Sequence, residues 1–371
     1  MSPEPYVAGR GAVSAFGSGR EALFDGIFEA KSGIRPLRRL AGGAALTSVA
    51  AEVPESVVAR CEGSDSLVFA LSEQAAHEAL REAQLEPDPG LGLILATTKA
   101  DLTGVVARGT GLGSPWRLLE QLARRLGIRG PSAAVSCACA SGLSALALGG
   151  AWIRAGTAER VLVIGADVLN DFILSGFSGL LALDPGPCRP FDRRRAGLSL
   201  GEGAGAIVLS AREAESLGWR LAAWGGSNDA NHVTGPCRDG SGLALAVRRA
   251  LERAALPPSA VDYVHLHGTG TPYNDAMECR ALAAVFAEPP CASGSKAQIG
   301  HTLGAAGVLE SLIALEALQR AQAPPNLGLE EPDPELGLAL AASARALPRA
   351  SVALKLAAGF GGINSALVFC S

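Results

Sequence analysis

The sequence predicts an α/β protein in which helices cover a mostly buried sheet, and three observations support this class. Short runs of β-branched or aliphatic residues alternate with segments of helical periodicity. Hydrophobic residues make up 48% and charged residues 18% of the 371 residues, which fits a large core or an apolar subunit interface. The second half of the chain repeats the plan of the first, which favours one large duplicated unit.

In the first half, apolar runs that are too short for helices predict the strands. Helical periodicity extends over 65–83, and 114–127 opens with a Ser cap and a first-turn Pro and closes with Gly, so both segments are expected to be helices. The predicted strands are 7–14, 91–98, 132–138, 160–168 and 205–210.

The second half shows the same alternation, and we expect units of 1–212 and 213–371. Two junctions, SCACASGLSALALGGAWI and IGHTLGAAGVLESLIALEAL, each lead a strand of small residues into a helix of small residues. Cys139 and His301 lie at matching points of these junctions, so two halves packed back to back would bring both to a common centre. A tandem of unrelated α/β domains is the alternative. The predicted elements are helices at 241–256, 275–287 and 303–320, a strand at 261–268, and final strands at 351–357 and 364–370.

Composition excludes several classes of protein. A formal net charge of -4 provides no basic field for nucleic acid. The eight cysteines are scattered without CxxC and no secretory segment opens the chain, so we expect reduced thiols and a cytoplasmic location. No apolar run is long enough to span a membrane. Metal-ligand spacing and nucleotide-binding glycine motifs are missing, so neither a metal nor a cofactor is expected.

The segment VSCACASG is a candidate nucleophile turn. A thiol where a strand turns into a helix lies near backbone N–H groups and the positive end of the helix dipole, which favours the thiolate. A lone Cys is more often a small core residue, and Cys137 is interpreted in that way. Cys139 is distinguished by the motifs elsewhere in the chain.

Three further Gly-rich turns carry polar residues: HGTGTPYND (267–275), GSKAQIGHTLGAAG (294–307) and AGFGGINS (358–365). Two of the five histidines, His267 and His301, and Lys296 fall in them. Each His alone would more often be structural. Together with Cys139 they predict a catalytic site, because catalytic groups commonly lie where strands and helices meet loops.

With these motifs the chain resembles the β-ketoacyl-acyl-carrier-protein synthases, condensing enzymes of the thiolase superfamily. The resemblance extends in order through GRGAVSAFGSGREALFDGIFEAKSGI, GPSAAVSCACASG, RPFDRRRAGLSLGEGAGAIVL, VDYVHLHGTGTPYNDAMECRAL, GSKAQIGHTLGAAG and GFGGIN. It implies the thiolase fold, a duplicated five-layered α/β/α/β/α arrangement. It also implies acyl and malonyl thioesters on acyl carrier protein as substrates, and a homodimer or a heterodimer with a second synthase-like subunit.

The resemblance also implies roles for individual residues. Cys139 would be the acylated nucleophile, His267 and His301 would act on the malonyl unit, and Lys296 would be a supporting charge. The backbone N–H groups of Cys139 and Phe360 would form the oxyanion hole. Glu278 matches an acidic residue of the family and is assigned a structural role.

Two departures from the family pattern concern the acyl pocket. Ala357 and Ala358 replace a Ser-Phe pair before Gly359 and Phe360, so a bulky gate residue is missing. The segment 98–129 is shorter than in housekeeping synthases, which favours a specialised product such as a polyene over bulk fatty-acid synthesis.

The function predicted from the resemblance is decarboxylative Claisen condensation in fatty-acid or polyketide biosynthesis. One alternative is a non-condensing subunit that shapes the pocket of a heterodimer, although the intact Cys139 argues against it. A thiolase or CoA-dependent acyltransferase is a third reading. Arg124 with Arg125, or the cluster Arg193 to Arg195, could dock an acidic carrier protein.

Overall fold

The main sheet of this computed structural model has eleven strands among the described residues, and its two ends have the same strand order. One short strand, β2 (Gly17–Ser18), lies outside that order and pairs with the first strand of the chain. The structure describes residues 3–40, 47–61, 66–86, 88–102, 113–338, 340 and 342–371. From one edge to the centre the order is β6 (Ser132–Val135), β5 (Gly92–Ala96), β7 (Arg160–Asp167), β8 (Gly203–Ser210) and β1 (Tyr6–Ser14). From the other edge it is β11 (Cys291–Ser293), β10 (Tyr263–His265), β14 (Val352–Gly359), β15 (Ile363–Cys370) and β9 (Arg220–Asn228).

The directions of the strands repeat as well. β5 is parallel to β6 and β7, and β10 is parallel to β11 and β14. The next strands in each half, β8 and β15, are antiparallel to their neighbours on both sides. Strand order and direction therefore show a duplicated fold, and we propose that the two units meet between residues 212 and 213.

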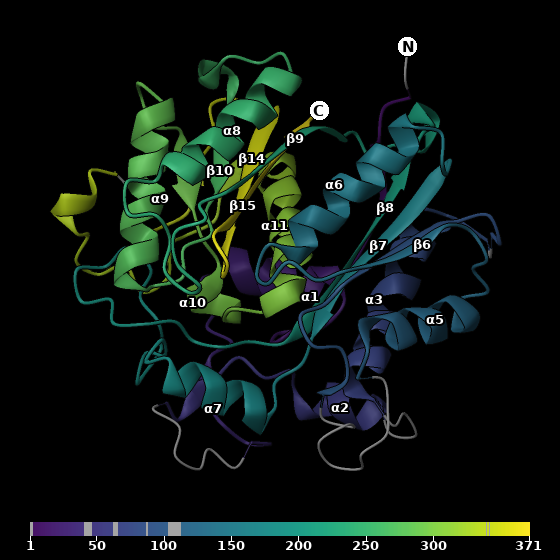
Figure 1. Ribbon diagram of the computed structural model, residues 1–371, viewed down its shortest axis with the longest axis horizontal. Helices are drawn as coiled ribbons and strands as arrows, with labels where there is room; N and C mark the ends of the chain where they lie inside the picture. The colour runs from purple at the N-terminus through teal and green to yellow at the C-terminus, as the bar shows by residue number, and fades with distance from the viewer. Residues whose placement is uncertain are drawn as a thin grey trace.

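Helices form three layers around this sheet (Figure 1). The outer layer of the first half contains α3 (Leu67–Glu82) and α5 (Pro115–Arg125), and that of the second half contains α8 (Ser241–Arg253) and α9 (Pro272–Val285). Between the halves lie α6 (Ser141–Arg154) and α11 (Ala306–Gln319), which gives the five layers of the thiolase fold. The remaining α-helices among the described residues are α1 (Arg20–Phe28), α2 (Glu55–Arg60), α7 (Asp171–Gly179) and α10 (Lys296–Ile299).

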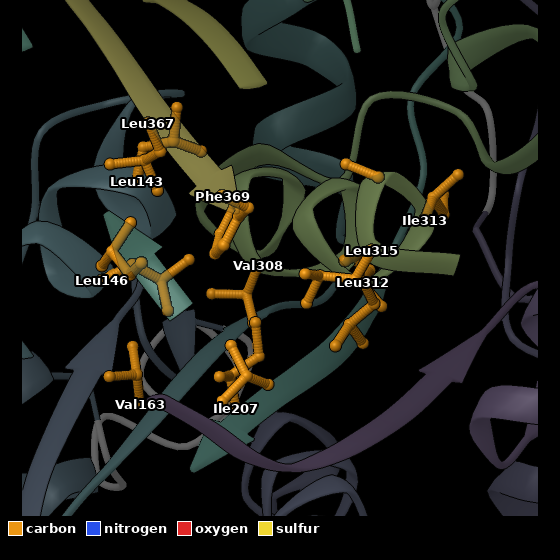
Figure 2. Packing of buried hydrophobic residues seen from close by; sticks show 14 of the residues in the cluster. Leu143, Leu146, Val163, Ile207, Val308, Leu312, Ile313, Leu315, Leu367 and Phe369 are labelled. Carbon is orange, nitrogen blue, oxygen red and sulfur yellow. The ribbon is translucent and has the colours of Figure 1, made fainter. Parts of the chain in front are cut away.

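The central core is formed by α6, α11 and the inner faces of both sheet halves. Figure 2 shows Leu143 and Leu146 of α6 in one cluster with Val308 and Leu312 of α11. All residues of α11 from 306 to 318 are buried, so this helix has no solvent face and shows no amphipathic pattern. Strands on both sides complete the cluster with Val163, Ile207, Leu367 and Phe369.

Two glycines allow the N-termini of α6 and α11 to approach each other. A Cβ on Gly142 would lie 2.7 Å from the backbone nitrogen of Val308, and one on Gly307 would lie 2.5 Å from that of Leu143. Both distances are shorter than real Cβ contacts, so any side chain would push the helices apart. The common centre predicted from the two matching junctions is therefore present.

The predicted strands and helices are present, with shifts at their ends. The strands predicted at 132–138 and 261–268 are shorter, because β6 and β10 stop before the turns that carry Cys139 and His267. The helix predicted from 303 begins with a 3₁₀ turn, Leu303–Ala305, and continues as α11. Residues 103–112 of the short 98–129 segment lie outside the described residues. No helix in the described part of the chain is long and apolar enough to cross a membrane.

Candidate active site

Cys139 lies on a tight turn between β6 and α6. Ala138 has a φ of 48°, a left-handed conformation that is unusual for a residue with a side chain. Ser141 fixes this turn, because its Oγ accepts a hydrogen bond from the Cys137 N–H at 2.8 Å and donates one to the Ala138 carbonyl at 2.5 Å. The turn holds Cys139, a residue that is 6% exposed, at the wall of a cavity.

The Cys139 thiol is protonated at neutral pH. Burial raises its pKa to about 11, although the Lys296 ammonium and a hydrogen bond from the Phe360 N–H lower it. From the sequence, the helix N-terminus was expected to favour the thiolate. Desolvation of the buried sulfur acts in the opposite direction and has the larger effect on the thiol pKa. The same contacts that lower the pKa would stabilise negative charge when it develops on the sulfur.

The two histidines lie side by side, with ring centroids 5.3 Å apart and an angle of 87° between their planes. The Leu303 N–H donates to His301 Nδ1 at 3.3 Å, and Lys296 Nζ lies 3.3 Å from His267 Nδ1. Both Nδ1 atoms are therefore acceptors, which assigns the proton of each ring to Nε2. Burial, followed by the positive charge of Lys296, lowers the pKa of both rings well below the usual value. His267 and His301 therefore each present a neutral Nε2–H donor.

Beside the histidines, three buried side chains form a charge cluster. Glu310 of α11 accepts a hydrogen bond from Lys296 Nζ through Oε1 at 2.5 Å. Its Oε2 forms an ion pair with Nζ of Lys355 at 2.7 Å. All three side chains are at most 1% exposed. Sequence reasoning missed Glu310 and Lys355, although each is a charged residue in an otherwise apolar run, LESLIAL and VALKLAA.

Glu278 and Asp275 hold the turn after His267. The Glu278 carboxylate accepts hydrogen bonds from the backbone N–H groups of His267 and Gly268 at 2.5 and 2.8 Å. Asp275 accepts hydrogen bonds from the backbone N–H groups of Thr269, Gly270 and Phe191. These contacts support the structural role assigned to Glu278. Burial raises its pKa to about 7.

A cavity of about 640 Å³ connects these groups to the surface. Cys139, His267 and His301 all line it. The Phe360 ring stacks on Phe177 of α7, with centroids 5.8 Å apart, and both rings line the cavity. The rest of the lining includes Leu180, Leu181, Ala182, Leu198, Thr269, Thr271, Ala358 and Gly359.

Comparison with known proteins identifies the family. The model of the β-ketoacyl synthase N-terminal domain matches residues 6–215, and that of the C-terminal domain matches residues 220–330. The chain belongs to the β-ketoacyl synthase family. It is therefore an acyl-transferring condensing enzyme.

Relatives of this synthase are similar over the full chain. Nodulation protein E of Rhizobium meliloti (strain 1021) is 33% identical over 402 aligned positions, which cover 100% of this chain and 99% of the relative. The 3-oxoacyl-[acyl-carrier-protein] synthase 2 of Coxiella burnetii is 29% identical, with 98% and 97% covered. Among solved structures, the ishigamide ketosynthase/chain length factor has a TM-score of 0.92 at 27% identity, with both chains fully covered.

Most of the predicted site residues of the synthase lie together, and Ala357 is the exception among the predicted pocket residues. Cys139, His267, His301, Lys296 and Phe360 surround or adjoin one cavity. Ala358 and Gly359 line the cavity, whereas Ala357 is buried and does not line it.

The two arginine groups suggested for docking lie apart from the cavity residues described above, and their docking role stays a prediction. Within the cluster Arg193 to Arg195, Arg194 pairs with Glu330 at 2.5 Å and Arg195 pairs with Asp333 at 2.6 Å. Arg124 and Arg125 lie on α5, which Figure 1 shows far from α7 at the cavity. A basic residue at the cavity is Arg238, whose guanidinium stacks on the Tyr273 ring with 4.6 Å to the centroid.

Proposed function

We propose that this synthase loads an acyl group on Cys139 and extends it by decarboxylative condensation with a malonyl unit on acyl carrier protein. The observation that carries the proposal is the arrangement of one thiol and two neutral imidazole N–H donors around a single cavity. The product is a 3-oxoacyl thioester in fatty-acid or polyketide biosynthesis. No cofactor takes part in the proposed steps.

The first step transfers the acyl group. Cys139 Sγ attacks the thioester carbonyl carbon, the carbon–sulfur bond to the carrier breaks, and the carrier thiol leaves with the proton that the Cys139 thiol gave up. The turn at Phe360 packs closely against the cysteine because residue 359 is a glycine. A Cβ on Gly359 would lie only 3.3 Å from the Cys139 nitrogen. The N–H groups of Phe360 and Cys139 are proposed to bind the oxyanion, each contributing about 2.7–4 kcal/mol.

The second step forms the carbon–carbon bond. The bond between the malonyl carboxylate and the α-carbon breaks, carbon dioxide leaves, and the electron pair moves toward the thioester oxygen as an enolate. The Nε2–H donors of His267 and His301 stabilise this oxygen. The enolate carbon then attacks the acyl carbonyl on Cys139, and the cysteine leaves as a thiolate that is protonated again.

A non-condensing partner subunit is the second candidate function, because one structural relative is a ketosynthase in complex with its chain length factor, at 25% identity and a TM-score of 0.83. The thiol and both histidines of this chain favour the condensing role. The match to both β-ketoacyl synthase domains argues against the thiolase hypothesis. A further relative at 25% identity is a ketosynthase in complex with its type II acyl carrier protein, which supports a carrier protein as substrate donor.

The proposed assembly is a homodimer, with a heterodimer as the alternative. Strand β6 ends the sheet, and its side chains, including Ala133 and Val135, are half-buried in the single chain. An edge strand with apolar side chains pairs readily with another chain. We also propose a cytoplasmic location, which fits eight free cysteines.

Intact-protein mass spectrometry tests the proposed function. Incubation with acyl-carrier thioesters of several chain lengths should add one acyl mass to the wild type, on Cys139. Addition of malonyl-carrier protein should then remove the adduct and release carbon dioxide in equal amount. Adduct formation only in the presence of a second synthase-like subunit would favour the partner-subunit function instead.

The missing gate residue gives a prediction about acyl specificity. Ala358→Phe should lower kcat/KM for long acyl groups by at least about tenfold relative to short ones, because a large ring would fill cavity space beside Cys139. Competition between short and long acyl-carrier thioesters measures this ratio. Ala283→Phe, on the exposed face of α9, is the matched control. An unchanged chain-length profile would show that the gate lies elsewhere.

A further inference from the structure

Lys355 is a buried ammonium that the proposed reaction does not use. It lies in β14 between Leu354 and Leu356, and its side chain is fully buried. Moving such a charge from water into a protein interior costs several kcal/mol unless it is paired. An apolar residue would suit this buried strand better, so a lysine at this position indicates a role beyond packing.

Lys355 contacts the backbone next to His267. Its Nζ forms the ion pair with Glu310 and donates hydrogen bonds to the carbonyls of Leu356 and, at 3.3 Å, Leu266. Leu266 is the residue before His267, and the carbonyl of His267 itself accepts a hydrogen bond from Lys296 at 2.5 Å. Two ammonium groups thus bind two consecutive carbonyls directly after β10, and one carboxylate pairs with both ammonium groups.

The cluster also carries more positive than negative charge. Lys296 and Lys355 share the single carboxylate of Glu310. The other ionisable groups that act on or respond to Lys355 are Glu278 of α9, His265 of β10, and the two site histidines, whose rings are neutral. Burial raises the pKa of Glu278 to about 7, although its hydrogen bonds from the backbone N–H groups of Gly268 and His267 oppose this. The malonyl carboxylate and the enolate that replaces it are both anions.

We propose that Lys355 is a positioning residue for decarboxylation, which holds the Leu266–His267 backbone and the Glu310 carboxylate and adds one positive charge behind the histidine pair. This inference rests on the proposed function. Lys355 does not touch the cavity, so it acts through His267 and Lys296. Its effect belongs to the malonyl step, since none of its contacts involves Cys139.

The proposal gives a pH dependence of its own. Burial and the neighbouring Lys296 lower the pKa of Lys355 to about 8, although Glu310 opposes this. Below that pH the ammonium is intact, and above it the charge is lost. The rate of carbon dioxide release should therefore fall as the pH rises through about 8.

Lys355→Met and Lys355→Gln test the role, because both remove the charge and leave Glu310 paired with Lys296. Carbon dioxide release from malonyl-carrier protein should fall about tenfold in kcat at pH 7. The decrease near pH 8 should disappear, while Cys139 acylation stays within about twofold of the wild type. The denaturation midpoint of Lys355→Met should be unchanged or higher, since an apolar side chain suits this buried site. Lys31→Met, which removes a half-exposed lysine, is the control.

The other outcomes distinguish a positioning role of Lys355 from a purely structural one. Equal losses in both half-reactions together with a lower midpoint would reduce Lys355 to a structural residue and overturn the inference. Wild-type rates and the wild-type pH profile in both variants would also overturn it, and the proposed function would remain. Wild-type protein that forms the Cys139 adduct but releases no carbon dioxide would instead overturn the proposed function and the inference together.

Discussion

His301→Ala should release carbon dioxide from malonyl-carrier protein at least about a hundredfold more slowly than the wild type, while Cys139 still becomes acylated. The reason is geometric. His301 Nδ1 accepts a hydrogen bond from the Leu303 N–H, so its Nε2–H is the free donor for the enolate oxygen. Loss of that donor leaves His267 alone to stabilise the charge. Acylation depends on other groups, namely the Cys139 thiol and the Phe360 N–H.

Cys139→Ala should show the reverse pattern. No acyl adduct can form without the thiol, whereas both imidazole donors remain and some decarboxylation should persist. Intact mass measures the first half-reaction and labelled carbon dioxide measures the second. His77→Ala is a suitable control for the histidine change, because His77 is about half-exposed on α3 and does not line the cavity.

The opposite result for His301 would change the assignment of roles. If His301→Ala lost acylation and kept decarboxylation, His301 would be the base that removes the proton from Cys139. The protonated state of this thiol makes the distinction important, because some group must take its proton during acyl transfer. The pKa of His301 is held low by burial and by Lys296, which makes it a poor base and favours the donor role.

Several parts of the fold could be predicted because their signals are local. The strand β8 and the helix α3 show clear apolar patterns, and α5 has a Pro and a Gly at the expected ends. The meeting of the two central helices was also predictable, since the junctions at Cys139 and His301 match in sequence. Small residues at both places permit the close approach of α6 and α11.

Other elements give weaker signals. Strand β9 reads RLAAWGGSN, and its two glycines and polar end look like a loop, yet pairing with β15 and packing of α8 make it a strand. Helix α7 reads DFILSGFSG, with two glycines that lower helix propensity. In both cases tertiary contacts decide the structure, and a single sequence does not contain them.

The site was predictable where motifs mark it and not where burial defines it. Cys139, His267 and His301 lie in Gly-rich turns that attract attention in the sequence. Glu310 and Lys355 lie inside a helix and a strand that otherwise look like core, and the two are 45 positions apart in the chain. Their pairing, and the thiol pKa that burial raises, depend on packing that only the structure provides.

Glu310→Leu should lower the free energy of unfolding by about 3–5 kcal/mol at pH 7, because it leaves two buried ammonium groups without their shared carboxylate. Lys296 and Lys355 are both fully buried, so water cannot replace the lost partner. Guanidinium denaturation measures the change. Glu29→Leu, which breaks the exposed pair with Lys31, should leave the denaturation midpoint unchanged.

The pH dependence of this loss identifies its cause. Without Glu310, the pKa of Lys355 in the folded protein loses the contribution that raises it, and it lies further below the value of about 10.4 of an unfolded lysine. The unfolded state then binds more protons, so stability must rise with pH until the unfolded pKa is reached. Glu310→Leu should therefore recover stability between neutral pH and about pH 10 more steeply than the wild type.

A compensating variant completes the test. The triple change Glu310→Leu, Lys296→Met and Lys355→Met removes all three charges and should restore most of the stability, since apolar residues of similar volume replace buried ion pairs at little cost. It should not restore carbon dioxide release, because His267 loses the ammonium at its Nδ1. A triple variant as unstable as Glu310→Leu alone would show that lost packing, and not unpaired charge, causes the instability.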